Sequence, residues 1–185
     1  GPMLFSAKGG KVKTIQQLDL PELFRIASQM YQGRKYPVAI KLYKRILTFF
    51  PRSKYRYAVL YNLALAYEDN KQYALAIQSY QSMIKENPTK KNNILNARFR
   101  MAACHNQRKE WKQALAAYDK ILQGQLEPDD RIDALAYSGR ALYHLKKDAQ
   151  AIPMLRVAVL THLRRQSIGK PQQVNYAAAM AQYYW

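Results

Sequence analysis

The chain has 185 residues and a formal net charge of +18 at pH 7, with 49% hydrophobic and 23% charged residues. This length and apolar content are sufficient to bury a core. The single cysteine, Cys104, excludes an internal disulfide framework. No apolar stretch reaches the roughly 18 residues that a membrane-spanning helix needs.

The N-terminal segment lacks hydrophobic periodicity. Gly1-Pro2 before Met3 is typical of the remnant of a protease-cleaved tag. Lysines recur between residues 3 and 19, at Lys8, Lys11 and Lys13. We therefore expect residues 1–19 to be a tag remnant followed by a flexible or loosely docked basic arm.

From residue 20 onward, a helix-pair pattern recurs four times. The repeats begin at Leu20, Tyr57, Leu95 and Ile132, at spacings of 37, 38 and 37 residues. A small residue stands at the eighth position of each repeat: Ala27, Ala64, Ala102 and Gly139. Alanine stands at the twentieth position, and the twenty-fourth holds Tyr43, Tyr80, Tyr118 and Leu155. Antiparallel helices approach closely only where side chains are small, so this pattern predicts stacked helix hairpins that share a core.

Repeat two shows the expected elements most clearly. Its segment Tyr61-Asn62-Leu63-Ala64, followed by Ala66-Tyr67, resembles the first-helix consensus of the tetratricopeptide repeat (TPR) family. The resemblance covers residues 20–163, as repeats 20–56, 57–94, 95–131 and 132–163. It implies an all-α fold, a right-handed α-solenoid of about four helix hairpins.

Repeat four departs most from the family pattern. Ser138 and Asp148 stand at normally apolar positions, and Pro153 falls inside the second helix. There it is expected to remove a hydrogen bond or to bend the axis. The period also exceeds the family standard of about 34 residues, so we expect the first helices that follow to be lengthened at their start by about one turn.

The long period and the junction Phe50-Pro51-Arg52-Ser53-Lys54-Tyr55 resemble bacterial cell-envelope members of the family, namely outer-membrane assembly lipoproteins and periplasmic cell-division coordinators. This resemblance favours the bacterial cell envelope or periplasm over the cytoplasm. Near the C-terminus, Pro171 is suited to open a helix. Residues 171–185 are expected to be either a solvating helix or the first helix of a truncated fifth repeat, in a fragment of a larger protein.

In the family, the first helices line a concave groove. The resemblance places an aromatic strip flanked by Arg and Asn there: Phe24, Arg25, Tyr61, Asn62, Phe99, Arg100, Tyr137 and Arg140. Large rings with few rotors are effective anchors for a partner peptide. The alternatives are that the rings serve helix-pair packing and that Asn62 is only a common family residue. The carboxylate-clamp set of some relatives is matched only at Asn62 and Arg100, and we do not expect that clamp.

Positive charge is concentrated toward the N-terminal end. No acidic residue occurs from Leu23 to Tyr67, and the first 67 residues carry +10 of the net charge. Because the predicted groove is formally neutral, the excess is expected on second helices and turns. That basic surface comprises Arg34, Lys35, Lys41, Lys44, Arg45, Arg52, Lys54 and Arg56. It should attract an acidic partner or surface.

Catalytic chemistry is not indicated. Cys104 and His105 are adjacent and point about 100° apart on a helix, so they cannot form a local dyad. His144 and His162 have no metal-ligand spacing relative to Cys104. Gly9-Gly10 lacks the context of a phosphate-binding loop. We therefore expect a protein without enzyme activity, cofactor or metal.

Three functions remain open. The first is a protein-interaction scaffold that binds a partner peptide or domain in the aromatic groove. The second is docking of the basic surface to an acidic protein or acidic envelope surface, such as anionic lipid or cell-wall polymer. The third is nucleic-acid binding, which is disfavoured because Tyr36 and Tyr43 are packing positions and the repeats lack regular base-reading residues.

Overall fold

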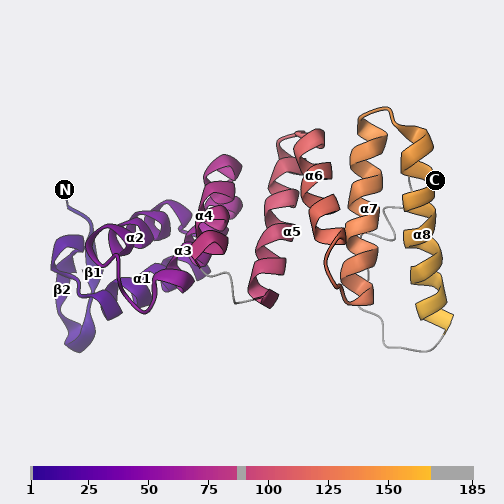
Figure 1. Cartoon of the computed structure of the whole chain (residues 1–185). Coiled ribbons are helices and arrows are strands. Elements are labelled where there is room, and N and C mark those ends of the chain that lie inside the picture. The colour runs from indigo at the N-terminus through magenta and orange to yellow at the C-terminus, as the bar shows by residue number, and fades with distance from the viewer. Residues whose placement is uncertain (1, 87–90, 168–185) are drawn as a thin grey trace. The chain divides into compact units, whose positions relative to one another are not determined.

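Helices form nearly all of the regular structure in the computed structural model, which describes residues 2–86 and 91–167 (Figure 1). The chain divides into two compact units, residues 1–97 and residues 98–185. Two short strands precede the helices: β1 (Leu4–Ser6) and β2 (Val12–Thr14). The helices are α1 (Leu20–Gln32), α2 (Tyr36–Phe49), α3 (Arg56–Asp69), α4 (Tyr73–Glu86), α5 (Lys91–Gln107), α6 (Trp111–Leu122), α7 (Pro128–His144) and α8 (Asp148–Ser167).

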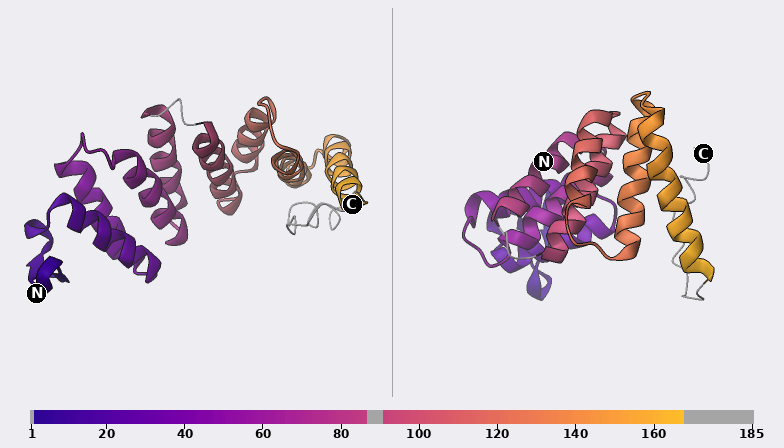
Figure 2. Two further views of the ribbon diagram at one scale, coloured as in Figure 1. Left: turned by 90° about the horizontal axis from the view of Figure 1, so that it is seen from below. Right: turned by 45° about the vertical axis from the view of Figure 1, so that its right-hand side comes forward.

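Helices that are neighbours in sequence pack on one another in both units. In the first unit α1 packs on α2, α2 on α3 and α3 on α4, while in the second α6 packs on α7 and α7 on α8. The antiparallel course of α7 and α8 is visible in both Figure 1 and Figure 2. The expected lengthening of first helices occurs in α5 and α7, which have 17 residues against 13 in α1. It does not occur in α3, which has 14 residues and begins only one residue before the repeat, at Arg56.

The same turn joins the two helices of all four repeats. Its left-handed residue is basic each time, and the four residues are Arg34, Lys71, Lys109 and Lys146, with φ of 58–59°. In repeat two, the Lys71 N–H donates to the carbonyl of Glu68, and the Gln72 N–H donates to the carbonyl of Tyr67. This pair of bonds is a Schellman motif, which usually has glycine at the left-handed position. A side chain there costs conformational energy that glycine would avoid.

The core of each repeat forms where the small residues allow close approach. Tyr43, Tyr80 and Tyr118 are at most 1% exposed, and the alanines at the twentieth repeat position are also buried. In repeat four, leucine replaces tyrosine and glycine replaces alanine. A Cβ atom added to Gly139 would lie 2.6 Å from Leu155 Cγ. The smaller residue on α7 therefore compensates for the different shape of the residue on α8.

The N-terminal segment, expected to be a flexible or loosely docked arm, is folded and docked. β1 and β2 form an antiparallel hairpin in which Phe5 is opposite Lys13. Phe5 and Leu18 are buried, and Lys13 Nζ lies 2.9 Å from Glu22 Oε2 of α1. The periodicity of the sequence could not reveal this, because strands of three residues are too short for a pattern and their stability comes from packing.

Repeat four accommodates its unusual residues. α8 continues through Pro153. Because Pro153 lies in the second turn of the helix, it removes only one bond near the N-terminal end. Ser138 is fully buried, and its hydroxyl has no hydrogen-bond partner among the described residues. The predicted C-terminal segment, residues 171–185, lies outside the described residues.

Candidate partner-binding faces

In the first unit, Phe24 of α1 is held between two other rings. It stacks on Tyr55 with ring centroids 5.0 Å apart and meets the buried Tyr43 edge-on at 6.5 Å. Tyr55 belongs to the extra residues that precede α3 and is capped by the Lys54 ammonium, 5.3 Å from the ring centroid. Phe24 is half-buried, so its ring is fixed by packing while part of it remains accessible.

Tyr61 of α3 occupies the equivalent place in repeat two. Its ring meets the buried Tyr80 edge-on, with centroids 6.0 Å apart, and its hydroxyl donates to Asn96 Oδ1 at 3.1 Å. Burial raises the pKa of Tyr43, while its hydroxyl's contacts with Ser28, 3.4 Å away, and then with Asn62 lower it. Asn62 is half-buried on α3.

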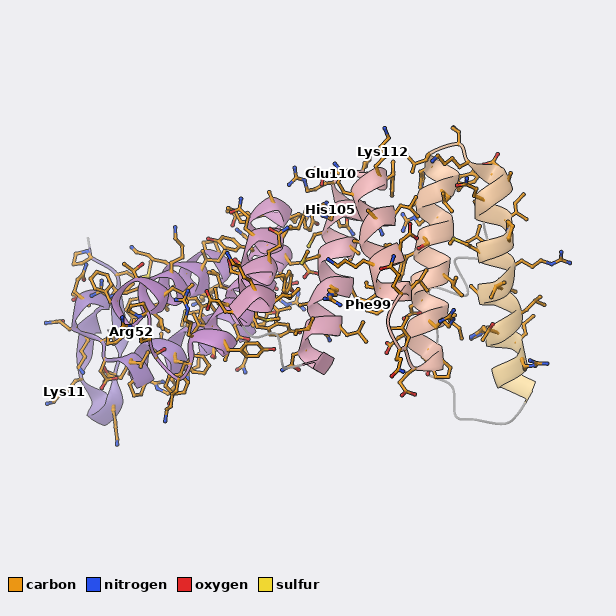
Figure 3. The ribbon with its side chains drawn as sticks, in the orientation of Figure 1. Lys11, Arg52, Phe99, His105, Glu110 and Lys112 are labelled. Carbon is orange, nitrogen blue, oxygen red and sulfur yellow. The ribbon has the colours of Figure 1, made fainter. Side chains whose placement is uncertain are left out.

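In the second unit, two predicted groove rings lie against Tyr118. Phe99 of α5, labelled in Figure 3, lies 6.3 Å from the Tyr118 centroid, and Tyr137 of α7 stacks on it at 5.4 Å. Burial, followed by the nearby Asp133, raises the pKa of Tyr137. Arg100 is half-buried. Each first-helix ring thus packs against a second-helix tyrosine. The alternative that these rings serve helix packing is therefore correct for one part of each ring.

Arg140 belongs to a separate cluster in the second unit. Its guanidinium carbon lies 5.9 Å from the ring centroid of Trp111, and that ring stacks on His144 at 4.0 Å. Burial, then Arg140 and Lys146, lowers the pKa of His144. The stack joins α6 to α7. Sequence reasoning did not find it, because the two rings are 33 positions apart and share no motif.

The hydrogen bonds of the buried tyrosines are a further feature that the sequence did not predict. Tyr80 donates to Glu68 Oε2 at 2.9 Å, and Asn106 Nδ2 donates to the Tyr118 hydroxyl at 3.1 Å. Glu68 and Asn106 share the twelfth position of their repeats, so a comparison of polar residues across repeats could have indicated this role. Burial is the main cause that raises the pKa of Tyr118, which keeps the phenol protonated.

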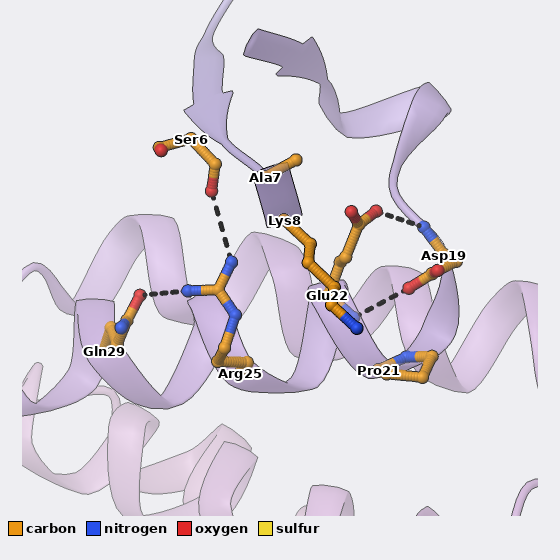
Figure 4. A pocket seen from close by; sticks show the side chains of 8 residues that line it. All are labelled: Ser6, Ala7, Lys8, Asp19, Pro21, Glu22, Arg25 and Gln29. Carbon is orange, nitrogen blue, oxygen red and sulfur yellow. Dashed lines mark hydrogen bonds between the residues drawn. The ribbon is translucent and has the colours of Figure 1, made fainter. Parts of the chain in front are cut away.

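The N-terminal hairpin borders the face of α1. Arg25 Nη2 donates to the Ser6 carbonyl at 3.2 Å, and Arg25 Nη1 donates to Gln29 Oε1 at 3.0 Å. Figure 4 shows both bonds beside a pocket of about 820 Å³. Its lining comprises Ser6, Ala7, Lys8, Asp19, Pro21, Glu22, Arg25 and Gln29. The predicted groove cation Arg25 is therefore oriented by the hairpin.

The predicted basic surface is largely exposed. Six of its members are exposed: Arg34, Lys35, Lys41, Lys44, Arg52 and Lys54. Arg45 is half-buried, with its guanidinium carbon 4.1 Å from the Phe49 ring centroid. Arg56 pairs with Glu86 through two hydrogen bonds of 2.7 and 2.8 Å, so its charge is offset within the first unit.

Comparison with known proteins identifies the family. The tetratricopeptide repeat model matches residues 23–53, 58–90 and 96–123. The chain belongs to the tetratricopeptide repeat family. The fourth TPR-like pair, α7–α8, lies beyond the matched segments, but its Schellman turn and close helix contact follow the same plan.

Solved structures show the same fold at low sequence identity. A crystal structure of MamA is 17% identical, with a TM-score of 0.67 over 84% of this chain and 79% of its own. MamA from Desulfovibrio magneticus RS-1 is 14% identical, with a TM-score of 0.64 over 80% of this chain and 78% of its own. The TPR-like repeats of a putative kinesin light chain from Podospora anserina are 15% identical, with a TM-score of 0.66 over 88% of this chain and 81% of their own. No curated protein sequence matches significantly. The predicted all-α TPR solenoid is confirmed; the resemblance to cell-envelope members stays a prediction.

Cys104 and His105, the adjacent side chains considered for catalysis, are both engaged in the fold. Cys104 is buried, and His105 Nδ1 lies 2.7 Å from Oε2 of Glu110. The other oxygen of this carboxylate pairs with Arg108. Residues 2–86 and 91–167 contain no group of three or more His, Cys, Asp or Glu side chains that could hold a metal ion. No helix in these ranges is long and apolar enough to cross a membrane.

Proposed function

We propose that this TPR chain is a non-enzymatic scaffold that binds a partner peptide or domain through the first helices of its repeats. The observation that carries the proposal is that the aromatic rings of the first helices are held in place by packing while part of each ring remains accessible. Phe24 and Tyr61 in the first unit, and Phe99 and Tyr137 in the second, are all half-buried against a tyrosine of the core.

Fixed rings are suited to binding because little freedom is lost when a partner covers them. An immobilised side chain costs about 0.5–1.5 kcal/mol on association, and packing against Tyr43 or Tyr80 has already removed much of that freedom. Aromatic anchors beside polar groups dominate many interfaces. In the first unit, Arg25 and Asn62 supply such groups on α1 and α3.

The proposal is tested by placing a photocrosslinking phenylalanine analogue at single positions. Tyr61 and Phe99 probe the first helices of the two units, and the exposed Leu75 of α4 is the matched control on a second helix. Crosslinking in source cells, followed by mass spectrometry, would identify the partner. We expect one protein at Tyr61 or Phe99 that is not captured at Leu75.

Binding of the purified partner is then measured with Phe24→Ala, Tyr61→Ala and Phe99→Ala, after circular dichroism has confirmed helical folding. A hot-spot ring typically costs about 2 kcal/mol or more on truncation, a loss of roughly 30-fold in affinity. Capture at Leu75 alone, or unchanged affinity in folded variants of all three rings, would show that the first helices do not bind the partner.

A further inference from the structure

The exposed side of α2 carries a continuous line of cations. Lys41, Lys44, Arg45 and Phe49 follow helical spacing on one face, and Arg52 lies in the turn after the helix. Lys41, Lys44 and Arg52 are exposed, and Arg52 is labelled in Figure 3. We call these five residues the basic ridge. The opposite face of α2 is buried in the first unit through residues that include Ala39, Tyr43 and Ile46.

Among the described residues, no carboxylate lies within ion-pair distance of the four cations of the basic ridge. α1 and α3 pack on α2, and their three carboxylates have other hydrogen-bond donors. Glu22 accepts from Lys13, Glu68 accepts from Tyr80, and Asp69 accepts from Tyr31. The field of the ridge therefore extends toward solvent.

Phe49 gives the basic ridge an apolar component. Its side chain is 59% exposed although it is large and hydrophobic. The Arg45 guanidinium lies over one face of the ring, 4.1 Å from its centroid. A single exposed ring is unremarkable by itself. Cations beside such a ring form the combination that binds the interface of an anionic bilayer, where cations meet headgroups and the ring enters the acyl boundary.

We propose that the basic ridge docks this chain onto an anionic lipid surface. An acidic peptide would meet mainly exposed ion pairs, each of which contributes little to affinity. A single-stranded nucleic acid requires successive rings on which bases stack, whereas Phe49 is the one exposed ring of α2, all of which the structure describes. A bilayer offers many anionic headgroups at once and adapts to a protruding helix. The ridge and the first-helix faces are different residues, so the two proposals fail independently.

The test is sedimentation with vesicles of phosphatidylcholine, with and without phosphatidylglycerol. The ridge variant is Lys41→Gln/Lys44→Gln/Arg52→Gln. The control variant, Lys112→Gln/Lys120→Gln/Lys147→Gln, removes equal charge from exposed sites in the second unit. Each basic residue near an anionic membrane contributes about fivefold to partitioning. We expect the ridge variant to bind phosphatidylglycerol vesicles roughly 100-fold more weakly, while the control stays near wild type.

Insertion of the ring is tested with Phe49→Trp. Brominated lipid should quench this variant more strongly than wild type, because the new tryptophan reaches the acyl region. Equal weakening by the ridge and control variants would show a response to net charge alone and overturn the proposal. Absence of vesicle binding would do the same. The proposal would also be overturned if a single-stranded oligonucleotide bound through the basic ridge while anionic vesicles did not bind.

Discussion

Replacing Gly139 by alanine tests the close contact between α7 and α8. The added Cβ would lie 2.6 Å from Leu155 Cγ and 2.7 Å from Leu155 Cδ2, well inside the 3.5–4.0 Å optimum for carbon atoms. Leu155 is only 2% exposed and belongs to the core of repeat four, so it has little room to move. Such overpacking costs about 1–3 kcal/mol, while replacing a helical glycine gains up to about 1 kcal/mol. We expect Gly139→Ala to destabilise the second unit by about 1 kcal/mol.

The sign should reverse when Leu155 is shortened. Leu155→Ala alone should cost about 2–5 kcal/mol because it leaves a cavity. It also removes the atoms that would collide with the new methyl group. In this background, Gly139→Ala should therefore stabilise the protein by about 1 kcal/mol through helix propensity and partial filling of the space.

The assay is urea unfolding followed by tryptophan fluorescence. The chain has two tryptophans, so a Trp185→Phe background leaves Trp111, which stacks on His144 in the second unit, as the reporter. The double-mutant cycle gives the coupling between the two positions. If Gly139→Ala changes the free energy of unfolding equally in both backgrounds, the contact does not limit the size of residue 139 and our reasoning is refuted.

Three further substitutions test other contacts. Lys71→Gly should raise the free energy of unfolding by about 0.5–1 kcal/mol in urea titrations, because glycine removes the left-handed strain but adds freedom to the unfolded chain; lower stability would contradict this. The hydrogen bond from Lys13 is the main cause that lowers the pKa of Glu22 in the folded protein. The ionised Glu22 therefore stabilises the fold at pH values above the ordinary pKa of glutamate, and this stabilisation is lost as the pH falls through the lowered pKa of the folded state. Glu22→Gln should therefore speed hydrogen exchange of the hairpin at neutral pH, with a difference from wild type that disappears in acid; a pH-independent difference would exclude the ion pair as its cause. Tyr80→Phe should cost about 1–2 kcal/mol because the Glu68 carboxylate loses a donor, and less in a Glu68→Gln background; equal costs in the two backgrounds would argue against this bond.

The first-helix rings show how far sequence reasoning could go toward the candidate site. Repeat position placed Phe24, Tyr61 and Phe99 on first helices, but it could not decide between an exposed groove and helix packing. In the structure, each ring contacts a second-helix tyrosine and remains partly accessible. The two alternatives describe different sides of one ring, which a one-dimensional pattern cannot separate. Whether a partner uses the accessible side stays a proposal.

The basic residues show a similar division. Their number and the absence of acids from Leu23 to Tyr67 are properties of the sequence. The structure determined that Arg56 is neutralised by Glu86, 30 positions away, and that Arg45 covers Phe49. Charge can be counted along a chain, but its effect depends on distances between side chains.

The sequence by itself determined the repeated helix pairs, because small residues at fixed positions decide where helices can approach, and the same spacing recurs along the chain. It did not determine the folding of the N-terminal hairpin, whose Phe5 is buried in the first unit and whose Lys13 reaches Glu22 on α1. Local helix pairs are encoded by periodicity within about 40 residues. A docked hairpin and paired charges depend on surfaces that exist only after the helices have packed, so only the tertiary structure could decide them.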